Sequence, residues 1–190
     1  ITAWGFNNQV PGPVLRSKKG YTLVVRVENN LPAPTMVHWH GIRLPATMDG
    51  TGEVQQPILP GESFEYRFIV PDAGTFWYHS HQNETVQMEK GMYGGIVIED
   101  DTHPVLDNEK ILVLDDMKLN TNNEFIQHGP VGRWIERHDG REGSTNLING
   151  KEALTLQIHA GQTERWRIIN AASARYFRLS LDGKYFKIIA

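Results

Sequence analysis

Residues 74–81, with the sequence GTFWYHSH, decide the fold class and carry the first sign of function. A glycine opens the segment, and Thr75 and three aromatic residues follow, which are residue types enriched in β-strands. Side chains alternate between the two faces of a strand, so His79 and His81 point to one face and Ser80 points to the other. The segment therefore predicts a strand that ends in two imidazoles lying side by side.

A second stretch, residues 36–42 (MVHWHGI), repeats this arrangement with His38 and His40 around Trp39. If the two strands are neighbours, four imidazoles converge. Neutral imidazole binds copper, zinc, iron or nickel, and a set of histidines without carboxylate or thiolate favours copper. One such pair is commonly an ordinary surface pair. Two pairs inside apolar, aromatic strands predict a metal site, because burying unpartnered imidazoles costs solvation free energy.

The rest of the chain consists of short strand patterns separated by glycine and proline turns, and no segment shows a sustained helical period. The 18 glycines and 10 prolines agree with many turns. We expect strands over 21–27, 62–70, 94–99, 110–114, 153–158, 164–169 and 176–181, and a helical turn over 85–90. This pattern predicts an all-β protein built from antiparallel β-sandwiches.

The chain also repeats itself, since residues 20–29 (GYTLVVRVEN) can be aligned with residues 161–170 (GQTERWRIIN). Both stretches begin with glycine, continue as an alternating strand that contains arginine, and end in asparagine. An acidic stretch with a proline, residues 100–104, has the composition of a domain boundary. We therefore predict two related sandwich domains, residues 1–103 with the histidine pairs and residues 104–190 without copper ligands.

Composition excludes several classes of function. The 190 residues contain 19 basic and 22 acidic side chains, a net charge of -3, without the concentrated basic face that nucleic-acid binding needs. No apolar run approaches the length of about 18 residues that indicates a membrane span. The sequence contains no cysteine, which excludes disulfides, thiolate zinc sites and iron–sulfur clusters, and also a blue-copper centre within these residues.

Several spaced motifs strongly resemble the N-terminal domain of the multicopper oxidases, the laccase-like enzymes of the cupredoxin fold. These motifs are residues 8–13 (NQVPGP), 38–45 (HWHGIRLP), 48–50 (MDG), 56–62 (QPILPGE), 74–81 (GTFWYHSH) and 91–94 (GMYG). Residues 104–190 are similar to the second domain of the family, on residues 147–150 (LING) and 167–171 (RIINA). The resemblance implies tandem cupredoxin-like Greek-key sandwiches, the second of them incomplete.

The resemblance also implies a role for each histidine in a trinuclear copper cluster, which in this family lies between the first and last cupredoxin domains. His38 corresponds to a type 2 copper ligand, and His40, His79 and His81 correspond to ligands of the type 3 pair. Asp49 matches a carboxylate that assists proton delivery, whereas from the residues alone it is a plain turn residue before Gly50. Family members couple one-electron oxidation of phenols, amines or metal ions to reduction of dioxygen to water, in the periplasm or outside the cell.

The departures from the family pattern matter as well. Family members carry two further HxH motifs and a blue-copper cysteine in the last domain, which this sequence does not contain. We therefore expect the chain to need the remaining cupredoxin domain or domains as partner, and to be inactive alone. A non-catalytic copper-binding module is the alternative. A mononuclear metallohydrolase is disfavoured because Gly41-Ile42, rather than an HxHxD pattern, follows His40. We expect the isolated histidines, His103, His128, His138 and His159, not to be ligands.

Overall fold

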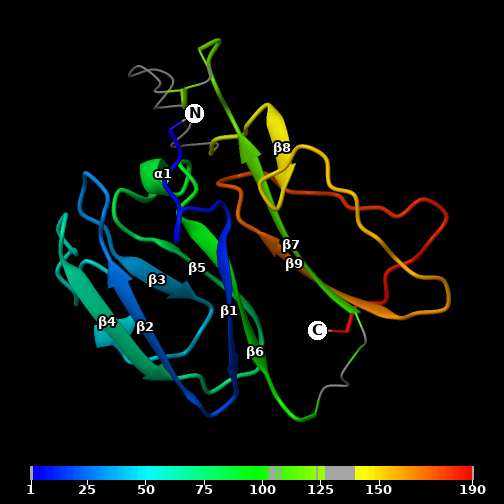
Figure 1. The fold of residues 1–190 in the computed structure, drawn as a ribbon, viewed down its shortest axis with the longest axis horizontal. Helices are drawn as coiled ribbons and strands as arrows, with labels where there is room; N and C mark the ends of the chain where they lie inside the picture. The colour runs from blue at the N-terminus through cyan, green and yellow to red at the C-terminus, as the bar shows by residue number, and fades with distance from the viewer. Residues whose placement is uncertain (1, 103–105, 107, 123, 127–139, 190) are drawn as a thin grey trace.

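The computed structural model describes residues 2–102, 106, 108–122, 124–126 and 140–189. They form mostly β-strands with very little helix (Figure 1), which confirms the predicted all-β class. Among these residues, no helix is long and apolar enough to span a bilayer.

Two sheets make up the first part of the chain. The larger has the strand order β1-β6-β5-β3, with β1 parallel to β6 and the other pairs antiparallel. The smaller is the antiparallel pair β2-β4. The elements are β1 (Gly12–Lys18), β2 (Thr22–Glu28), β3 (Val37–His40), β4 (Ser63–Ile69), β5 (Gly74–Ser80) and β6 (Tyr93–Glu99), with the 3-10 turn η1 (Ala46–Met48) and the short helix α1 (Glu84–Gln87).

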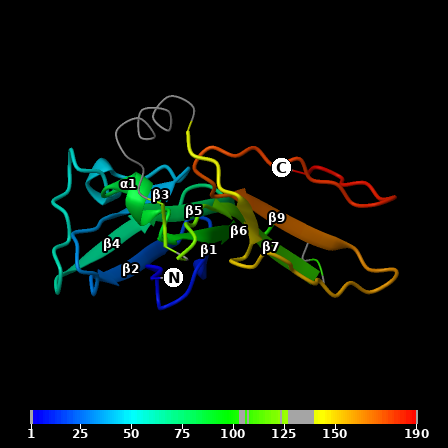
Figure 2. The same cartoon turned by 90° about the horizontal axis from the view of Figure 1, so that it is seen from above.

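A third sheet of order β8-β7-β9 lies beside the first part of the chain. It contains β7 (Asn108–Met117), β8 (Thr145–Ile148) and β9 (Glu164–Asn170). Strand β7 pairs antiparallel with β8 and parallel with β9. In Figures 1 and 2, β2 and β4 lie at one end of the molecule, β7 and β9 lie at the other, and β5 and β6 lie between them.

The alternation of side chains along β3 and β5 separates the apolar core from the histidines. Trp39 of β3 and Tyr78 of β5 point towards the β2-β4 pair, where they pack with Tyr66 and Phe68 in the main core. Because neighbouring residues point to opposite faces, the imidazoles on these strands lie on the other face of the sheet. The main core thus packs against the face of β3 and β5 that is opposite to the histidines.

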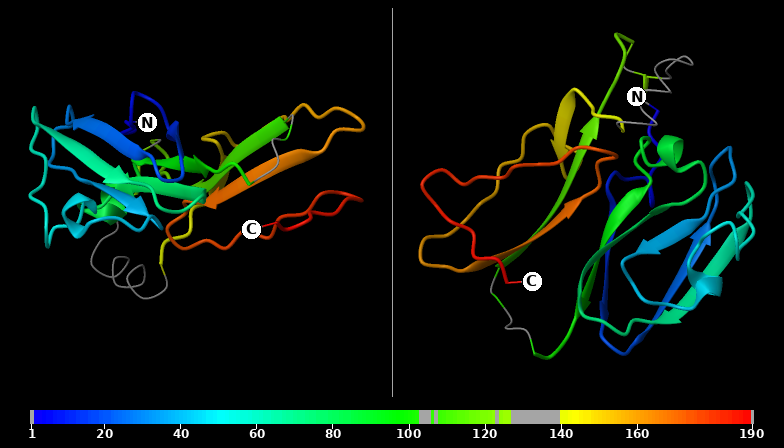
Figure 3. Two further views of the ribbon diagram at one scale, coloured as in Figure 1. Left: turned by 90° about the horizontal axis from the view of Figure 1, so that it is seen from below. Right: turned by 180° about the vertical axis from the view of Figure 1, so that it is seen from behind.

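A second, smaller core joins the four-stranded sheet to the third sheet. Tyr93 of β6 packs there with Val113 of β7 and Ile169 of β9, and Trp77 of β5 is part of the same cluster. Trp77 and His79 are two residues apart on one strand, so they share a face. The face of the sheet that carries the histidines is therefore also the face against which the third sheet packs. Figure 3 shows the sheets from below and from behind.

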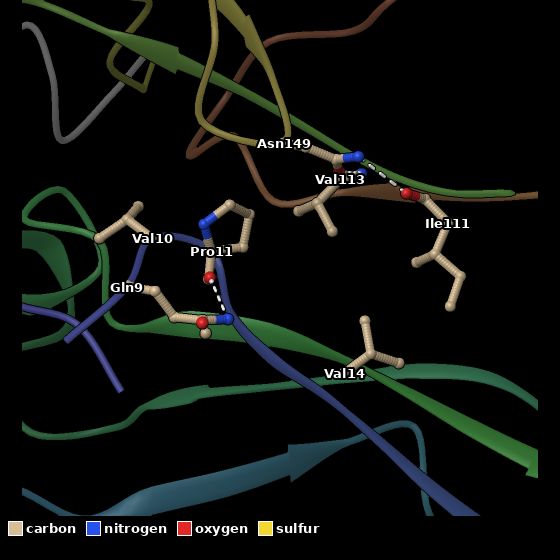
Figure 4. Close-up of a pocket in the computed structure, with 8 residues that line it drawn as sticks. Gln9, Val10, Pro11, Val14, Ile111, Val113 and Asn149 are labelled. Atoms are coloured by element: carbon tan, nitrogen blue, oxygen red, sulfur yellow. Dashed lines mark hydrogen bonds between the residues drawn. The ribbon is translucent and has the colours of Figure 1, made fainter. Parts of the chain in front are cut away.

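A crevice of about 300 Å³ opens between β1 and β7 (Figure 4). The described residues that line it are apolar or neutral, and the polar side chain of Asn149 is already hydrogen-bonded to the backbone of Ile111 and Val113. A Cβ on Gly150 would overlap the carbonyl oxygen of Val10, so the two parts of the chain approach closely beside the crevice. This lining has no acid, base or metal ligand, and we assign no chemistry to it.

Most of the predicted strands are confirmed, and α1 lies where a helical turn was expected. Two predictions are wrong, because residues 153–158 and 176–181 are not strands. A strand needs a hydrogen-bonded neighbour along its length. Among the described residues, 153–158 have no β-partner and 176–181 have only an isolated bridge between Leu181 and Lys184. Ile158 and Tyr176 are accordingly 67% and 96% exposed. Strands β1 and β8 were not predicted from the sequence.

The internal repeat has a counterpart in local geometry. Gly20 and Gly161 both adopt left-handed backbone angles, with φ of 84° and 82°. At the other end, Asn29 and Asn170 each accept a hydrogen bond from the backbone N–H two residues later and donate to a nearby carbonyl. The strands between them pair differently, since β2 is antiparallel to β4 and β9 is parallel to β7. The predicted boundary at residues 103 and 104 lies outside the described residues and stays a prediction.

Candidate metal centre

Strands β3 and β5 bring the two histidine pairs together. They are antiparallel neighbours, and His38 lies directly opposite His79 in the register. The centroid of the His38 ring lies 5.4 Å from that of His40, 5.3 Å from that of His79 and 5.4 Å from that of His81. All four imidazoles therefore gather on one face of the sheet, at its β3 edge.

Three of the rings offer nitrogen atoms at a spacing that suits one ion. Ligand nitrogens of His38, His40 and His79 all lie within 4.8 Å of one another. Nδ1 of His40 lies 3.3 Å from Nε2 of His79. Two nitrogens bound to one ion at about 2.0–2.1 Å, with a tetrahedral angle between the bonds, are about 3.3–3.4 Å apart. The donor set and its spacing therefore fit a transition-metal ion.

His81 stands slightly apart from this group of three. Its ring centroid is 6.3 Å from that of His79, and the two rings are stacked with an interplanar angle of 29°. The wall beside the histidines is aromatic, because the Trp77 ring lies 4.4 Å from the His79 ring and 5.0 Å from the His40 ring. An indole packed against two imidazoles limits their rotation and shields them from water on that side.

Hydrogen bonds fix the tautomers of two of the histidines. Nδ1 of His79 lies 2.9 Å from the carbonyl oxygen of Ser80 and 3.4 Å from a carboxylate oxygen of Glu84. Nδ1 of His38 lies 2.9 Å from the carbonyl oxygen of Asp49 and 3.2 Å from its carboxylate. A carbonyl oxygen only accepts, so both Nδ1 atoms carry the proton and both Nε2 atoms keep the lone pair that a metal needs.

Burial keeps the His79 imidazole in the neutral form that binds metals. His79 is 2% exposed, and this burial, with smaller contributions from the neighbouring histidines, lowers its pKa to about 4. Burial also lowers the pKa of His40, and the proximity of His38 adds to the effect. His79 is therefore uncharged at pH 7, and no proton has to leave it when a metal binds.

The turn that carries Asp49 is built against β3. Asp49 ends the 3-10 turn η1, and the next residue, Gly50, has a φ of 71°. A Cβ on Gly50 would overlap the carbonyl oxygen of Val37, which leaves no room for any other residue at this position. The glycine thus lets the turn approach β3 closely enough for Asp49 to contact His38. The Asp49 carboxylate is 32% exposed, so it reaches both the imidazole and the solvent.

Two family models, each described as multicopper oxidase, match residues 1–103 and residues 68–190. The chain belongs to the multicopper oxidase family. The copper resistance protein A of Pseudomonas syringae pv. tomato is 45% identical over the whole of this chain, which covers 38% of that protein. The multicopper oxidase MmcO of Mycobacterium tuberculosis is 37% identical over 96% of this chain and 41% of its own length.

Solved structures of multicopper oxidases agree. The crystal structure of the enzyme from Pseudomonas thermotolerans superposes with a TM-score of 0.83 and 37% identity, over 90% of this chain and 41% of that one. The chain thus has the cupredoxin domains of the family and spans about 40% of the length of the relatives it matches. Membership of the family makes copper the metal that the histidine cluster would hold.

The structure brings together every site residue that the sequence indicated: His38, His40, His79, His81 and Asp49. His159 is exposed and does not belong to the group of closely spaced ligand atoms, whereas His103, His128 and His138 lie outside the described residues. Sequence reasoning missed Glu84, which lies beside Nδ1 of His79. The sequence did contain a signal for it. Glu84 follows the second histidine pair by only three residues and begins α1, so it stays close to that pair.

Proposed function

We propose that this chain supplies half of the ligands of a trinuclear copper cluster in an oxidase. The whole enzyme would couple one-electron oxidation of phenols, aromatic amines or low-valent metal ions to the reduction of dioxygen to water. The observation that carries the proposal is the meeting of four strand-borne imidazoles on one face, with His40 Nδ1 and His79 Nε2 at 3.3 Å. Membership of the multicopper oxidases supports the choice of metal and reaction.

Each histidine has a proposed place in the cluster. His40 and His79 would hold one copper of the type 3 pair, which their short nitrogen–nitrogen distance supports, and His81 would bind the other. His38 would bind the type 2 copper through Nε2, because its Nδ1 is committed to Asp49. Bound copper supplies one-electron redox chemistry. The protein supplies a neutral imidazole at His79 and an indole, Trp77, that packs against the rings of His79 and His40.

Asp49 is proposed to move protons rather than to bind metal. Reduction of dioxygen to water consumes four protons, so a carboxylate that reaches both solvent and the site has an evident use. The Asp49 carboxylate is partly exposed and lies 3.2 Å from Nδ1 of His38, which matches this role. In the complete enzyme, we expect Asp49→Asn to slow dioxygen reduction at unchanged copper content. Unchanged turnover across the pH range would return Asp49 to the role of a turn residue.

The remaining partners follow from the share of the ligands present here. Further cupredoxin domains of the same enzyme would supply the other ligands, and dioxygen and a small reducing substrate would be the reactants. We propose an extracytoplasmic location, periplasmic or secreted, on the strength of the family resemblance. Because these residues contain no cysteine for an electron-accepting copper, we expect the chain alone not to turn over.

Copper binding by the chain tests the proposal. We expect Cu²⁺ titration, followed by electron paramagnetic resonance (EPR), to show a centre with nitrogen hyperfine coupling from imidazole. His40→Ala and His79→Ala should each lower the affinity at least tenfold. His159→Ala, which changes an exposed histidine outside the group of closely spaced ligands, serves as the control and should leave binding unchanged. Equal binding by all three variants would contradict the proposal.

A further inference from the structure

A buried glutamine lies directly behind the second histidine pair. Gln87 ends α1 and is only 2% exposed. Its amide oxygen accepts hydrogen bonds from the hydroxyl groups of Thr35 (2.8 Å) and Ser80 (2.7 Å), and its amide nitrogen donates to the carbonyl oxygen of Pro34 (2.8 Å). Thr35 and Ser80 are 1% and 0% exposed. A buried polar cluster that is satisfied in this way holds its members in one arrangement.

The partners leave Gln87 one orientation. The Pro34 carbonyl can only accept, so the amide NH₂ must face it and the amide oxygen must face the two hydroxyls. Both lone pairs of that oxygen are then used. The Ser80 hydroxyl in turn accepts from the backbone N–H of Gln82 at 3.2 Å. The cluster therefore fixes the direction of the Ser80 side chain from two sides.

The position of Ser80 makes this cluster relevant to the metal centre. Ser80 lies between His79 and His81, and its side chain points away from the face that carries the imidazoles. Thr35 lies three residues before His38, and the backbone N–H of His81 donates to the carbonyl oxygen of Met36 at 3.0 Å. Gln87 thus joins the ends of both histidine strands from the opposite face of the sheet.

We propose that Gln87 is a positioning residue for the copper centre. By holding Ser80 and Thr35 together, it sets the direction in which His79 and His81 meet His38, without touching the metal. The inference rests on the proposed copper site and deepens it. A role in stability alone makes a different prediction, because the affinity of a folded variant for copper would then be unchanged.

Three substitutions separate these roles. Gln87→Met keeps the length of the side chain and removes all three hydrogen bonds. Thr35→Val keeps the shape and removes one hydroxyl, whereas Thr35→Ser keeps the hydroxyl and serves as the conservative variant. Asn149→Ala, in the loop after β8, is the control for stability, because it breaks backbone hydrogen bonds far along the chain from the histidine strands.

The measurement is Cu²⁺ affinity and the EPR spectrum of the copper-loaded chain, for variants whose circular dichroism shows that they are folded. We expect Gln87→Met to lower the affinity about tenfold and to change the copper hyperfine splitting, with a smaller effect from Thr35→Val. Thr35→Ser and Asn149→Ala should match the unmodified chain. Thr35→Val keeps the inference testable if Gln87→Met does not fold.

Two outcomes would overturn the inference, and they are distinguishable. If Gln87→Met and Thr35→Val bind Cu²⁺ with the affinity and spectrum of the unmodified chain, while His79→Ala does not, the copper site stands and Gln87 does not position it. If the unmodified chain shows no imidazole-bound copper, the proposed function and this inference fall together.

Discussion

Asp115→Asn should remove a pH dependence of stability that the structure builds into the junction between β6 and β7. Asp115 lies on β7 and is 9% exposed, and it accepts a hydrogen bond of 2.5 Å from the hydroxyl group of Tyr93 on β6. Burial outweighs this hydrogen bond and raises the pKa of Asp115 to about 7. Tyr93 is the cross-strand neighbour of His79, so this contact fastens the third sheet beside the histidines.

The sign and size of the effect follow from linkage. The folded protein holds the Asp115 proton up to about pH 7, whereas the unfolded chain releases it near pH 4. The contribution of Asp115 to the free energy of unfolding therefore falls as the pH rises from about 4 to about 7 and is constant above that. A difference of about 3 pKa units corresponds to about 4 kcal/mol at most. Asn keeps an acceptor for Tyr93 and does not titrate.

Urea unfolding of both proteins between pH 4.5 and 8 is the assay. His79 contributes in the opposite direction, because its lowered pKa makes the free energy of unfolding rise between about pH 4 and pH 6.5. The informative quantity is therefore the difference between Asp115→Asn and the unmodified chain, which should grow by about 3 kcal/mol from pH 4.5 to pH 8. Asp182→Asn, at an exposed position, should show no such trend. A difference that is independent of pH would show that the folded and unfolded chains hold the Asp115 proton equally.

Two further substitutions test the turns that the fold requires. Gly50→Ala would place a Cβ on the carbonyl oxygen of Val37 at a left-handed φ, so we expect the free energy of unfolding in urea to fall by about 3 kcal/mol. Cu²⁺ binding should also weaken, because the turn that carries Asp49 moves away from His38. Unchanged copper affinity in a destabilised variant would show that this turn does not contribute to the metal site. Asn149→Ala would remove two hydrogen bonds to the β7 backbone at a left-handed position, and should lower the free energy of unfolding by about 2–4 kcal/mol. A decrease below about 0.5 kcal/mol would show that these hydrogen bonds contribute little to stability.

Local pattern was enough to predict the fold class and the histidine array. The alternation of β5 placed His79 and His81 on one face, and the same rule placed His38 and His40 together on β3. That the two strands are neighbours depends on pairing between residues far apart in the chain. The two HxH pairs and the family resemblance together predicted that the strands meet, because strand propensity alone does not select a partner.

The wrongly predicted and the missed strands also depend on pairing between residues far apart in the chain. Residues 153–158 have the alternation of a strand but no hydrogen-bonded neighbour among the described residues, whereas β1 begins with Gly12 and Pro13 and becomes a strand because β6 offers it a parallel edge. The role of Gln87 was also out of reach of the sequence. A glutamine in a helical turn is an ordinary exposed residue until the turn folds back onto Ser80.

Crystallography of the copper-loaded chain, with anomalous data collected above and below the copper absorption edge, tests the central claim most directly. The claim predicts an anomalous peak about 2.0–2.1 Å from both Nδ1 of His40 and Nε2 of His79, with that peak absent below the edge. Copper density elsewhere on the protein, with these two nitrogens still within hydrogen-bonding distance of each other, would contradict the proposed copper site.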